Sequence, residues 1–226
     1  MSDYLFDEFN EISAKEWKQK IQVDLNGADY NETLIWKNLE GIDVKPFYHQ
    51  DDFKGEFKEI PGFPKNWNIA QSIFIDDEKI ANYLILDSIK RGAEAVVLTA
   101  NKEFNIEQVF HKISFKNTVI YFELKFISES FILNLKHFFS SKKTSIFYNI
   151  DIIGNLAKSG NWFSNFKEDH STLGKIIAQN PQENIISVDG TLFQNSGATM
   201  IQQLAYCLSQ VNEYLNHFQN RQFSKN

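Results

Sequence analysis

The spacing of hydrophobic residues near the N-terminus predicts one short helix. Ser13 and Glu16 form a capping-box pattern, and apolar side chains recur every four residues from Trp17 to Leu25. Gly27 then supplies a stop signal. We therefore expect a helix over residues 14–26.

Residues 28–65 show no such period. Turn-forming Gly and Pro residues are spread through this segment, which carries only short β-like pieces such as residues 33–36. It is expected to be an extended arm. Its large aromatic side chains are too numerous for a solvated linker, so they should be buried against a partner chain or against the protein's own core. These aromatic residues are Trp36, Phe47, Tyr48, Phe53, Phe57 and Phe63.

From Trp67 onward, short apolar runs alternate with helical stretches. The predicted strands are residues 68–75, 95–99, 118–126, 145–152 and 185–188. The predicted helices are residues 77–90, 105–113, 129–139, 163–179 and 198–218. Apolar stripes mark the first and last of these helices, and they comprise Ile80, Leu84 and Ile89 and then Ile201, Leu204, Leu208, Val211 and Leu215.

Five strand–helix units in succession predict an α/β fold with a parallel sheet, because each crossover helix returns the chain to the next strand. Strands this apolar fit burial on both faces. The units could form a doubly wound open sheet or the first five units of an eight-stranded barrel, and periodicity leaves both open. The expected parts of the chain are the helix and arm (1–65), the strand–helix units (66–219) and a polar tail (220–226).

Composition narrows the class of protein. The 226 residues are 42% hydrophobic, enough to bury the core of one large or two small domains. The net charge of −6 and the absence of long Lys/Arg runs argue against nucleic-acid binding. The acidic N-terminus does not resemble a signal peptide, and the apolar runs are too short to span a membrane. A single cysteine, Cys207, is expected to be a buried structural thiol, which makes the cytoplasm the default compartment.

A search for catalytic patterns finds little. The histidines never recur at metal-ligand spacing, and they are His49, His111, His137, His170 and His217. Asp169 and His170 are adjacent, but their charged surroundings favour a solvated first turn of a helix. Residues 154–160 are similar to a phosphate loop, yet Ala157 stands where a glycine should precede Lys158. No nucleophile elbow is present, and packing is the simplest role for the tryptophans at 17, 36, 67 and 162.

The run that ends at Asp189-Gly190 is where an α/β unit would place its chemistry. The residues that follow it are Thr191, Leu192, Phe193 and Gln194. None of these four is an acid, a base or a metal ligand, so we expect no catalytic, cofactor-binding or metal-binding residue in this chain.

Several motifs nevertheless resemble one family. The arm contains Leu34-Ile35-Trp36, Glu40-Gly41-Ile42, Val44-Lys45-Pro46 and Tyr48, and the closing stretch contains Gly197-Ala198-Thr199, Leu204-Ala205-Tyr206, Leu208 and Glu213-Tyr214. Ala81-Asn82 and Arg91-Gly92-Ala93 lie between them. These stretches resemble the methylmalonyl-CoA mutases over residues 5–218, in the same order along the chain.

This resemblance implies a coenzyme-B12-dependent isomerase that interconverts methylmalonyl-CoA and succinyl-CoA. Its N-terminal domain would be an eight-stranded TIM-type barrel threaded by the pantetheine of the CoA ester, of which this chain would form part. Some bacterial members pair a catalytic large chain with a related small chain that has lost the active site.

The departures from the family pattern point to that small chain. Aligned on Gly197, the position of the catalytic histidine falls on Leu192, which cannot exchange a proton. The segment with the catalytic tyrosine is missing, because Asn66 leads straight into Trp67. The cobalamin-ligand motif Asp-x-His-x-x-Gly is also missing. We therefore expect a structural small subunit that binds no cofactor, with adenosylcobalamin on a large catalytic partner in a heterodimer.

Two alternatives remain open at this stage. The chain could be an active acyl-CoA mutase fragment whose working residues lie elsewhere. It could also be an α/β module unrelated to the mutases that binds a small ligand. The unpaired edges of a five-unit sheet further predict self-association when the chain is alone.

Overall fold

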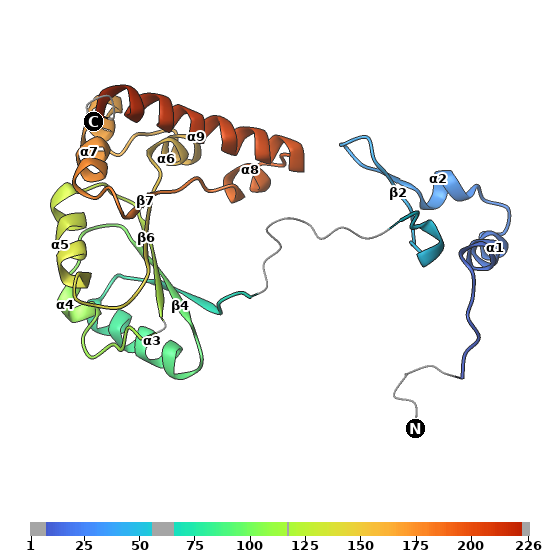
Figure 1. The fold of residues 1–226 in the computed structure, drawn as a ribbon, viewed down its shortest axis with the longest axis horizontal. Helices are drawn as coiled ribbons and strands as arrows, with labels where there is room; N and C mark the ends of the chain where they lie inside the picture. The colour runs from blue at the N-terminus through green and yellow to red at the C-terminus, as the bar shows by residue number, and fades with distance from the viewer. Residues whose placement is uncertain (1–7, 56–65, 117, 223–226) are drawn as a thin grey trace. The chain divides into compact units, whose positions relative to one another are not determined.

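A computed structural model describes residues 8–55, 66–116 and 118–222, with side chains described up to residue 218. The chain divides into two compact units, residues 1–64 and 65–226 (Figure 1). Phe57 and Phe63 of the predicted arm lie outside the described residues, as do residues 223–226 of the predicted tail.

The N-terminal unit begins with the predicted helix. Helix α1 spans Ala14–Asp24, and Ser13 and Glu16 form both hydrogen bonds of the capping box. The elements that follow are α2 (Tyr30–Leu34), β1 (Trp36–Lys37), β2 (Asp43–Val44) and the 3₁₀ helix η1 (Gln50–Asp52). The prediction of a β-like piece at residues 33–36 is therefore wrong for residues 33 and 34, which belong to helix α2. A helix forms there because the Asp29 carboxylate accepts hydrogen bonds from the backbone N–H groups of residues 31 and 32.

The arm folds back on helix α1. The Ala14 N–H donates to the carboxylate of Asp51 at 3.2 Å, and the Trp17 and Phe47 rings meet edge to face. The ammonium of Lys18 lies 4.7 Å from the centre of the Tyr30 ring. The arm is thus not extended as expected, because these contacts tie it to α1. Trp36, Tyr48 and Phe53 still remain more than half exposed.

The C-terminal unit is built on a parallel sheet of five strands in the order β3-β4-β5-β6-β7. The strands are β3 (Ala70–Phe74), β4 (Ala95–Ala100), β5 (Val119–Leu124), β6 (Ile146–Ile150) and β7 (Asn184–Ile186). This confirms the predicted sequential order and excludes the doubly wound arrangement, in which the strand order reverses.

Helices connect the strands and flank the sheet (Figure 1). They are α3 (Glu78–Lys90), α4 (Ile106–Val109), α5 (Glu129–Phe139), α6 (Ile152–Ser159), α7 (Phe166–Gln179), α8 (Thr191–Asn195) and α9 (Met200–Gln222). The five predicted helices of this unit appear as α3, α4, α5, α7 and α9, whereas α6 and α8 were not predicted. Helix α9 continues beyond residue 219, so the predicted boundary between domain and tail falls within a helix.

The core lies on one face of the sheet. Alternate residues of the central strands, such as Leu98, Phe122 and Tyr148, are almost fully buried. Most residues on the opposite face of these central strands are half-buried, and among them the rings of Tyr121 and Phe147 stack 4.8 Å apart. The expected burial on both faces is therefore wrong within this unit, because its helices cover only one face.

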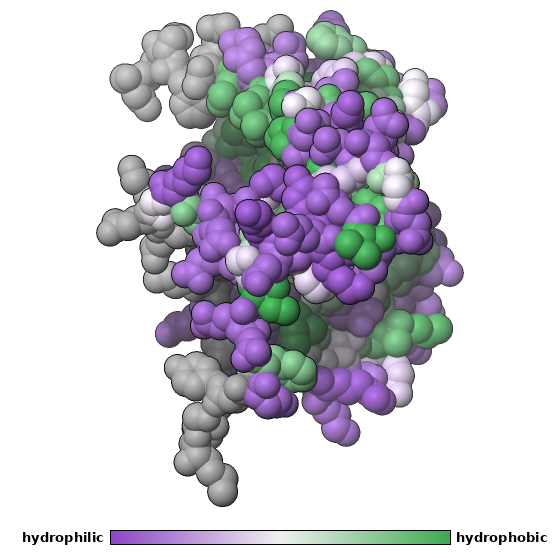
Figure 2. All heavy atoms as spheres, turned by 90° about the vertical axis from the view of Figure 1, so that its right-hand side faces the viewer, coloured by the Kyte–Doolittle hydropathy of each residue, from purple (hydrophilic) through white to green (hydrophobic). Residues whose placement is uncertain are grey.

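The apolar stripe of helix α9 is exposed. Ile201, Leu204 and Leu208 are between 60% and 64% exposed, whereas Tyr214 and Phe218 are buried. Helix α9 therefore packs on its own unit with a different face, which carries Tyr214 and Phe218. Ile80 of the α3 stripe is likewise exposed, at 61%. Figure 2 shows hydrophobic side chains reaching the surface among polar ones. Within the described residues, none of the helices is both long and apolar enough to cross a membrane.

Candidate functional site

A pocket of about 510 Å³ lies at the carboxyl ends of strands β5, β6 and β7. It is lined by Glu123, Leu124, Lys125, Asn149, Asp151, Gly154, Asn155, Lys158, Ser159, Phe163, Ser187, Val188, Asp189 and Leu192. Open α/β sheets bind their ligands at this edge, because the loops and helix ends that follow the strands meet there. This pocket is the candidate functional site.

The alternation of side chains along strands β5 and β6 places several lining residues on the face of the sheet that the helices leave uncovered. Tyr121, Glu123 and Lys125 alternate with the buried Phe122 and therefore share the uncovered face of the sheet. On the next strand, Asn149 lies on the same face and has a φ angle of 48°. Such a left-handed backbone is uncommon outside glycine, although asparagine tolerates it better than most residues.

Asp151 is the most firmly held acid of the pocket. It caps helix α6, and its Oδ1 atom accepts hydrogen bonds from the Gly154 N–H at 2.8 Å, the Gln210 amide at 2.5 Å and the Tyr214 hydroxyl at 2.7 Å. The Tyr214 oxygen in turn accepts from the Ile153 N–H at 3.0 Å. Burial, reinforced by Asp151, raises the pKa of Tyr214 above its ordinary range. This network fixes helix α9 to helix α6, so Asp151 has a structural role.

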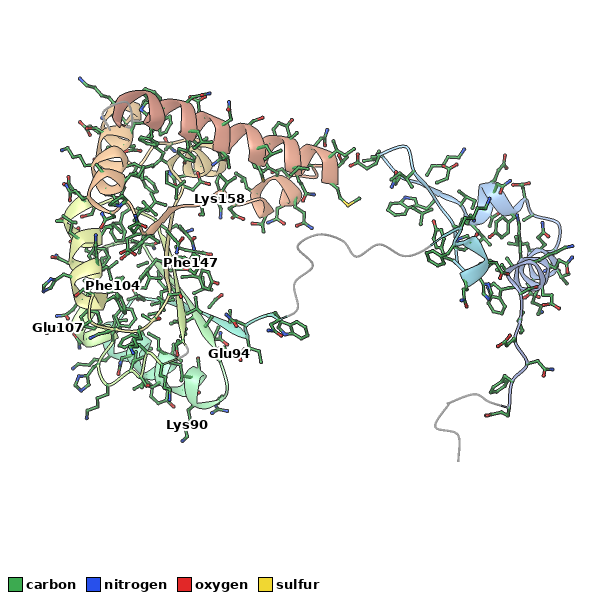
Figure 3. All side chains as sticks on the ribbon, in the orientation of Figure 1. Lys90, Glu94, Phe104, Glu107, Phe147 and Lys158 are labelled. Carbon is green, nitrogen blue, oxygen red and sulfur yellow. The ribbon has the colours of Figure 1, made fainter. Side chains whose placement is uncertain are left out.

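The phosphate-loop-like run 154–160 is mostly helical. Residues 154–159 belong to α6, which ends at Gly160 with a φ angle of 75°. Lys158 therefore lies in the last turn of a helix. Lys158 also lines the pocket, and it is labelled in Figure 3.

Leu192 reaches the pocket from helix α8, where it is half-buried. This short helix begins after Asp189, whose Oδ1 atom accepts hydrogen bonds from the Thr191 N–H at 3.0 Å and the Thr191 hydroxyl at 2.6 Å. The stretch expected to hold chemistry after β7 thus contributes an aliphatic side chain.

Asp169 and His170 are buried, being 1% and 5% exposed, so the solvated turn expected for them is wrong. The Asp169 carboxylate accepts hydrogen bonds from the backbone N–H groups of Phe163 at 2.7 Å and Ser164 at 3.0 Å. The His170 ring lies 4.3 Å from the His217 ring, and its Nδ1 atom is 2.8 Å from the Phe166 carbonyl oxygen. The hydrogen bonds from these backbone N–H groups compensate the burial of the carboxylate, and they fix the loop that precedes α7.

The remaining candidates are not brought together. His49 caps the helix η1 in the N-terminal unit, while Cys207 is half-buried on α9 and not fully buried as predicted. Trp162 packs against Phe166 and His170, as its predicted packing role requires. Across the described ranges, no three His, Cys, Asp or Glu side chains are grouped to hold a metal ion.

Sequence reasoning missed several pocket residues, including Lys125, Asn149 and Asp151. The signal that could have found them is position, since Lys125 and Asp151 come directly after strands β5 and β6 and Asn149 is the penultimate residue of β6. Their side chains do not form a recognisable local motif.

Comparison with known proteins identifies related sequences. The family described as Methylmalonyl-CoA mutase matches residues 103–226. A Methylmalonyl-CoA mutase small subunit from Porphyromonas gingivalis is 30% identical over 105 residues, which cover 41% of this chain and 17% of the relative. A Methylmalonyl-CoA mutase from Rhizobium meliloti is 21% identical over 255 aligned positions, covering 91% of this chain and 36% of the relative. The chain thus spans well under half the length of either relative.

Proposed function

Because the chain belongs to the methylmalonyl-CoA mutase family, we propose that it acts as a non-catalytic, small-subunit-like partner of a catalytic mutase chain. The observation that carries this proposal is Leu192. It lines the pocket at the position that the family resemblance assigns to the catalytic histidine. An aliphatic side chain can neither donate a hydrogen bond to a thioester carbonyl nor exchange a proton.

The acids of the pocket support the same proposal. Asp151 accepts three hydrogen bonds and Asp189 accepts two, all from groups of this chain. Carboxylates held in this way are poorly placed to act as general bases toward a substrate. The family match also removes the alternative of an α/β module unrelated to the mutases.

The strand order of the sheet supports the proposal that this unit is part of a barrel. Sequential parallel strands with one uncovered face are what the first five units of an eight-stranded barrel would present. We propose that the uncovered face and the exposed α9 stripe are covered when the barrel is completed or a partner binds.

The residues of this chain do not fit cobalamin. The Asp-x-His-x-x-Gly ligand motif is absent from the sequence. The buried His170 already interacts with a carbonyl oxygen through Nδ1. We therefore propose that adenosylcobalamin, which would supply the radical chemistry of the isomerisation, is held by the catalytic partner.

Exposed apolar side chains support association. Leu204 and Leu208 on α9 and Trp36 in the N-terminal unit are each at least 60% exposed. Surfaces of this kind mark contacts with other chains. We propose a heterodimer with the larger mutase chain, and self-association when this chain is alone. The cytoplasm is the proposed compartment, since a single cysteine excludes an internal disulfide.

Mixing the purified chain with the large mutase chain tests this proposal. Size-exclusion chromatography with light scattering should show a one-to-one complex. Substituting Leu192→Ala in this chain should leave mutase turnover by the complex unchanged, because the pocket takes no part in catalysis. Failure to form any complex, or a large loss of turnover with Leu192→Ala in a folded complex, would contradict the proposal.

A further inference from the structure

The pocket contains polar side chains without protein partners. Lys125, Asn149, Lys158 and Ser187 all line it, and within the described residues none of their side chains takes part in a hydrogen bond or ion pair. They come from the ends of three neighbouring strands and from helix α6. All four can donate hydrogen bonds, and two of them are cationic.

The acids of the pocket do not neutralise these lysines. The carboxylates of Asp151 and Asp189 are occupied by donors of the chain, as described above. The third acid, Glu123, is exposed and accepts one long hydrogen bond, of 3.4 Å, from the Thr99 hydroxyl. The three acids and two lysines sum to a formal charge of −1, which disfavours a highly charged ligand. The side chains of Lys125, Asn149, Lys158 and Ser187 supply four donors that still lack a partner, and those of Asn149 and Ser187 can also accept.

We infer that this pocket binds a small molecule through one oxyanion group, a carboxylate or a phosphate, held by Lys125 and Lys158 with Asn149 and Ser187 as neutral donors. Hydrogen bonds from ammonium groups to oxyanions are among the stronger ones in proteins. The volume of about 510 Å³ lies within the range of small-molecule sites. Leu124, Val188 and Leu192 give the same pocket an apolar wall for the rest of the ligand.

This inference does not depend on the proposed subunit role. A pocket that lacks a free general base can bind a ligand without converting it. The left-handed backbone at Asn149 adds to the case, because uncommon backbone conformations cluster at ligand-binding positions.

Nuclear magnetic resonance of the isotopically labelled full chain provides the test. Inorganic phosphate and the monocarboxylate butyrate would be titrated separately, against sodium chloride at matched ionic strength. We expect at least one of the two anions to cause saturable shifts at the amides of residues 125, 149, 158 and 187. The anion that saturates identifies which oxyanion the pocket prefers.

Matched variants decide whether the lysines bind the anion. Lys125→Met and Lys158→Met should each weaken binding roughly tenfold or more, as expected for the loss of a charged hydrogen bond. Lys167→Met, at an exposed position on α7 outside the pocket, should leave the affinity unchanged. Both pocket lysines are exposed, so these variants should fold normally. Absence of saturable shifts with both anions would overturn the inference, as would equal weakening by all three substitutions.

Discussion

The hydroxyl group of Tyr214 joins helix α9 to the start of helix α6. It donates to the Asp151 carboxylate and accepts from the Ile153 N–H, and its side chain is 4% exposed. Removing the hydroxyl would leave the Ile153 N–H without its partner. It would also take away one of the three hydrogen bonds of Asp151 Oδ1, which would keep those from the Gly154 N–H and the Gln210 amide.

We predict that Tyr214→Phe lowers the free energy of unfolding by about 1–3 kcal/mol. Urea denaturation followed by circular dichroism would measure the change. Tyr206→Phe is the matched control on the same helix, because Tyr206 is 52% exposed, and it should change stability by less than about 0.5 kcal/mol. Equal effects of the two substitutions would contradict the role assigned to the Tyr214 hydroxyl.

The raised pKa of the same hydroxyl leads us to predict that the folded chain loses stability in alkaline solution. Burial raises the pKa of Tyr214 and of Tyr148 above the ordinary value of about 10, with further contributions from Asp151 and Glu183 respectively. The folded state therefore retains protons that the unfolded state releases. This contribution to stability is fully present below about pH 10 and is lost as the pH rises toward the folded-state pKa.

Urea midpoints between pH 8 and pH 11 would measure this dependence. The wild-type chain should lose stability above about pH 10, and Tyr214→Phe should lose less, because one of the two buried phenols is gone. Identical pH profiles for the two proteins would show that Tyr214 does not contribute.

At the scale of elements, two glycines within helices are expected to respond in opposite ways to substitution by alanine. A Cβ atom at Gly154 in α6 would collide with the Asp151 carboxylate, whereas at Gly174 in α7 it would meet only Phe218, at an ordinary contact distance of 3.5 Å. The two helices thus differ in whether they can accept a side chain.

We predict that Gly154→Ala destabilises the chain by about 1–3 kcal/mol because of this overpacking. Gly174→Ala should stabilise it by up to about 1 kcal/mol, because alanine loses less backbone entropy in a helix. Thermal unfolding of the two variants would measure both signs. Stabilisation by Gly154→Ala would mean that the capping geometry of Asp151 is wrong.

The elements differ in how far the sequence predicts them. The strands and the long helices follow from hydrophobic periodicity, as the identical predicted and observed bounds of α5 (Glu129–Phe139) illustrate. Helix α6 was missed because it begins directly after β6, with Asp151 alone between two isoleucines. Helix α8 is only five residues long and lacks a side-chain cap, so its sequence offers no start signal.

The candidate site was less predictable than the fold. Leu192 could be singled out through a family motif, but the pocket around it combines residues from β5, β6, α6 and the segment after β7. The buried state of Asp169 was also not evident, because its adjacent charged residues suggested a solvated turn. Both features depend on tertiary contacts that local patterns do not contain.

At the scale of the whole molecule, the stripe of helix α9 is a row of exposed apolar side chains. Its apolar residues recur at intervals of three and four from Ile201 to Leu215, which is the spacing of helices that pack against a neighbouring element. Tyr214 and Phe218, which pack against the unit's own core, are not part of this stripe.

We predict that the double substitution Leu204→Gln and Leu208→Gln weakens binding to the large mutase chain at least tenfold. Both side chains are about 60% exposed, so the stability of the isolated chain should change little. Glu213→Gln, at an exposed position on the same helix but outside the stripe, should leave binding unchanged. Surface plasmon resonance would measure the affinities, and full affinity in the double variant would show that the stripe is not the contact.

The central claim is that this chain is a mutase-family protein without catalysis of its own. Its most direct test is turnover of methylmalonyl-CoA by the isolated chain with adenosylcobalamin supplied. We predict no succinyl-CoA above a no-protein control, and none from Leu192→His, because the tyrosine segment is also missing. Cobalamin-dependent turnover by the purified wild-type chain would contradict the claim.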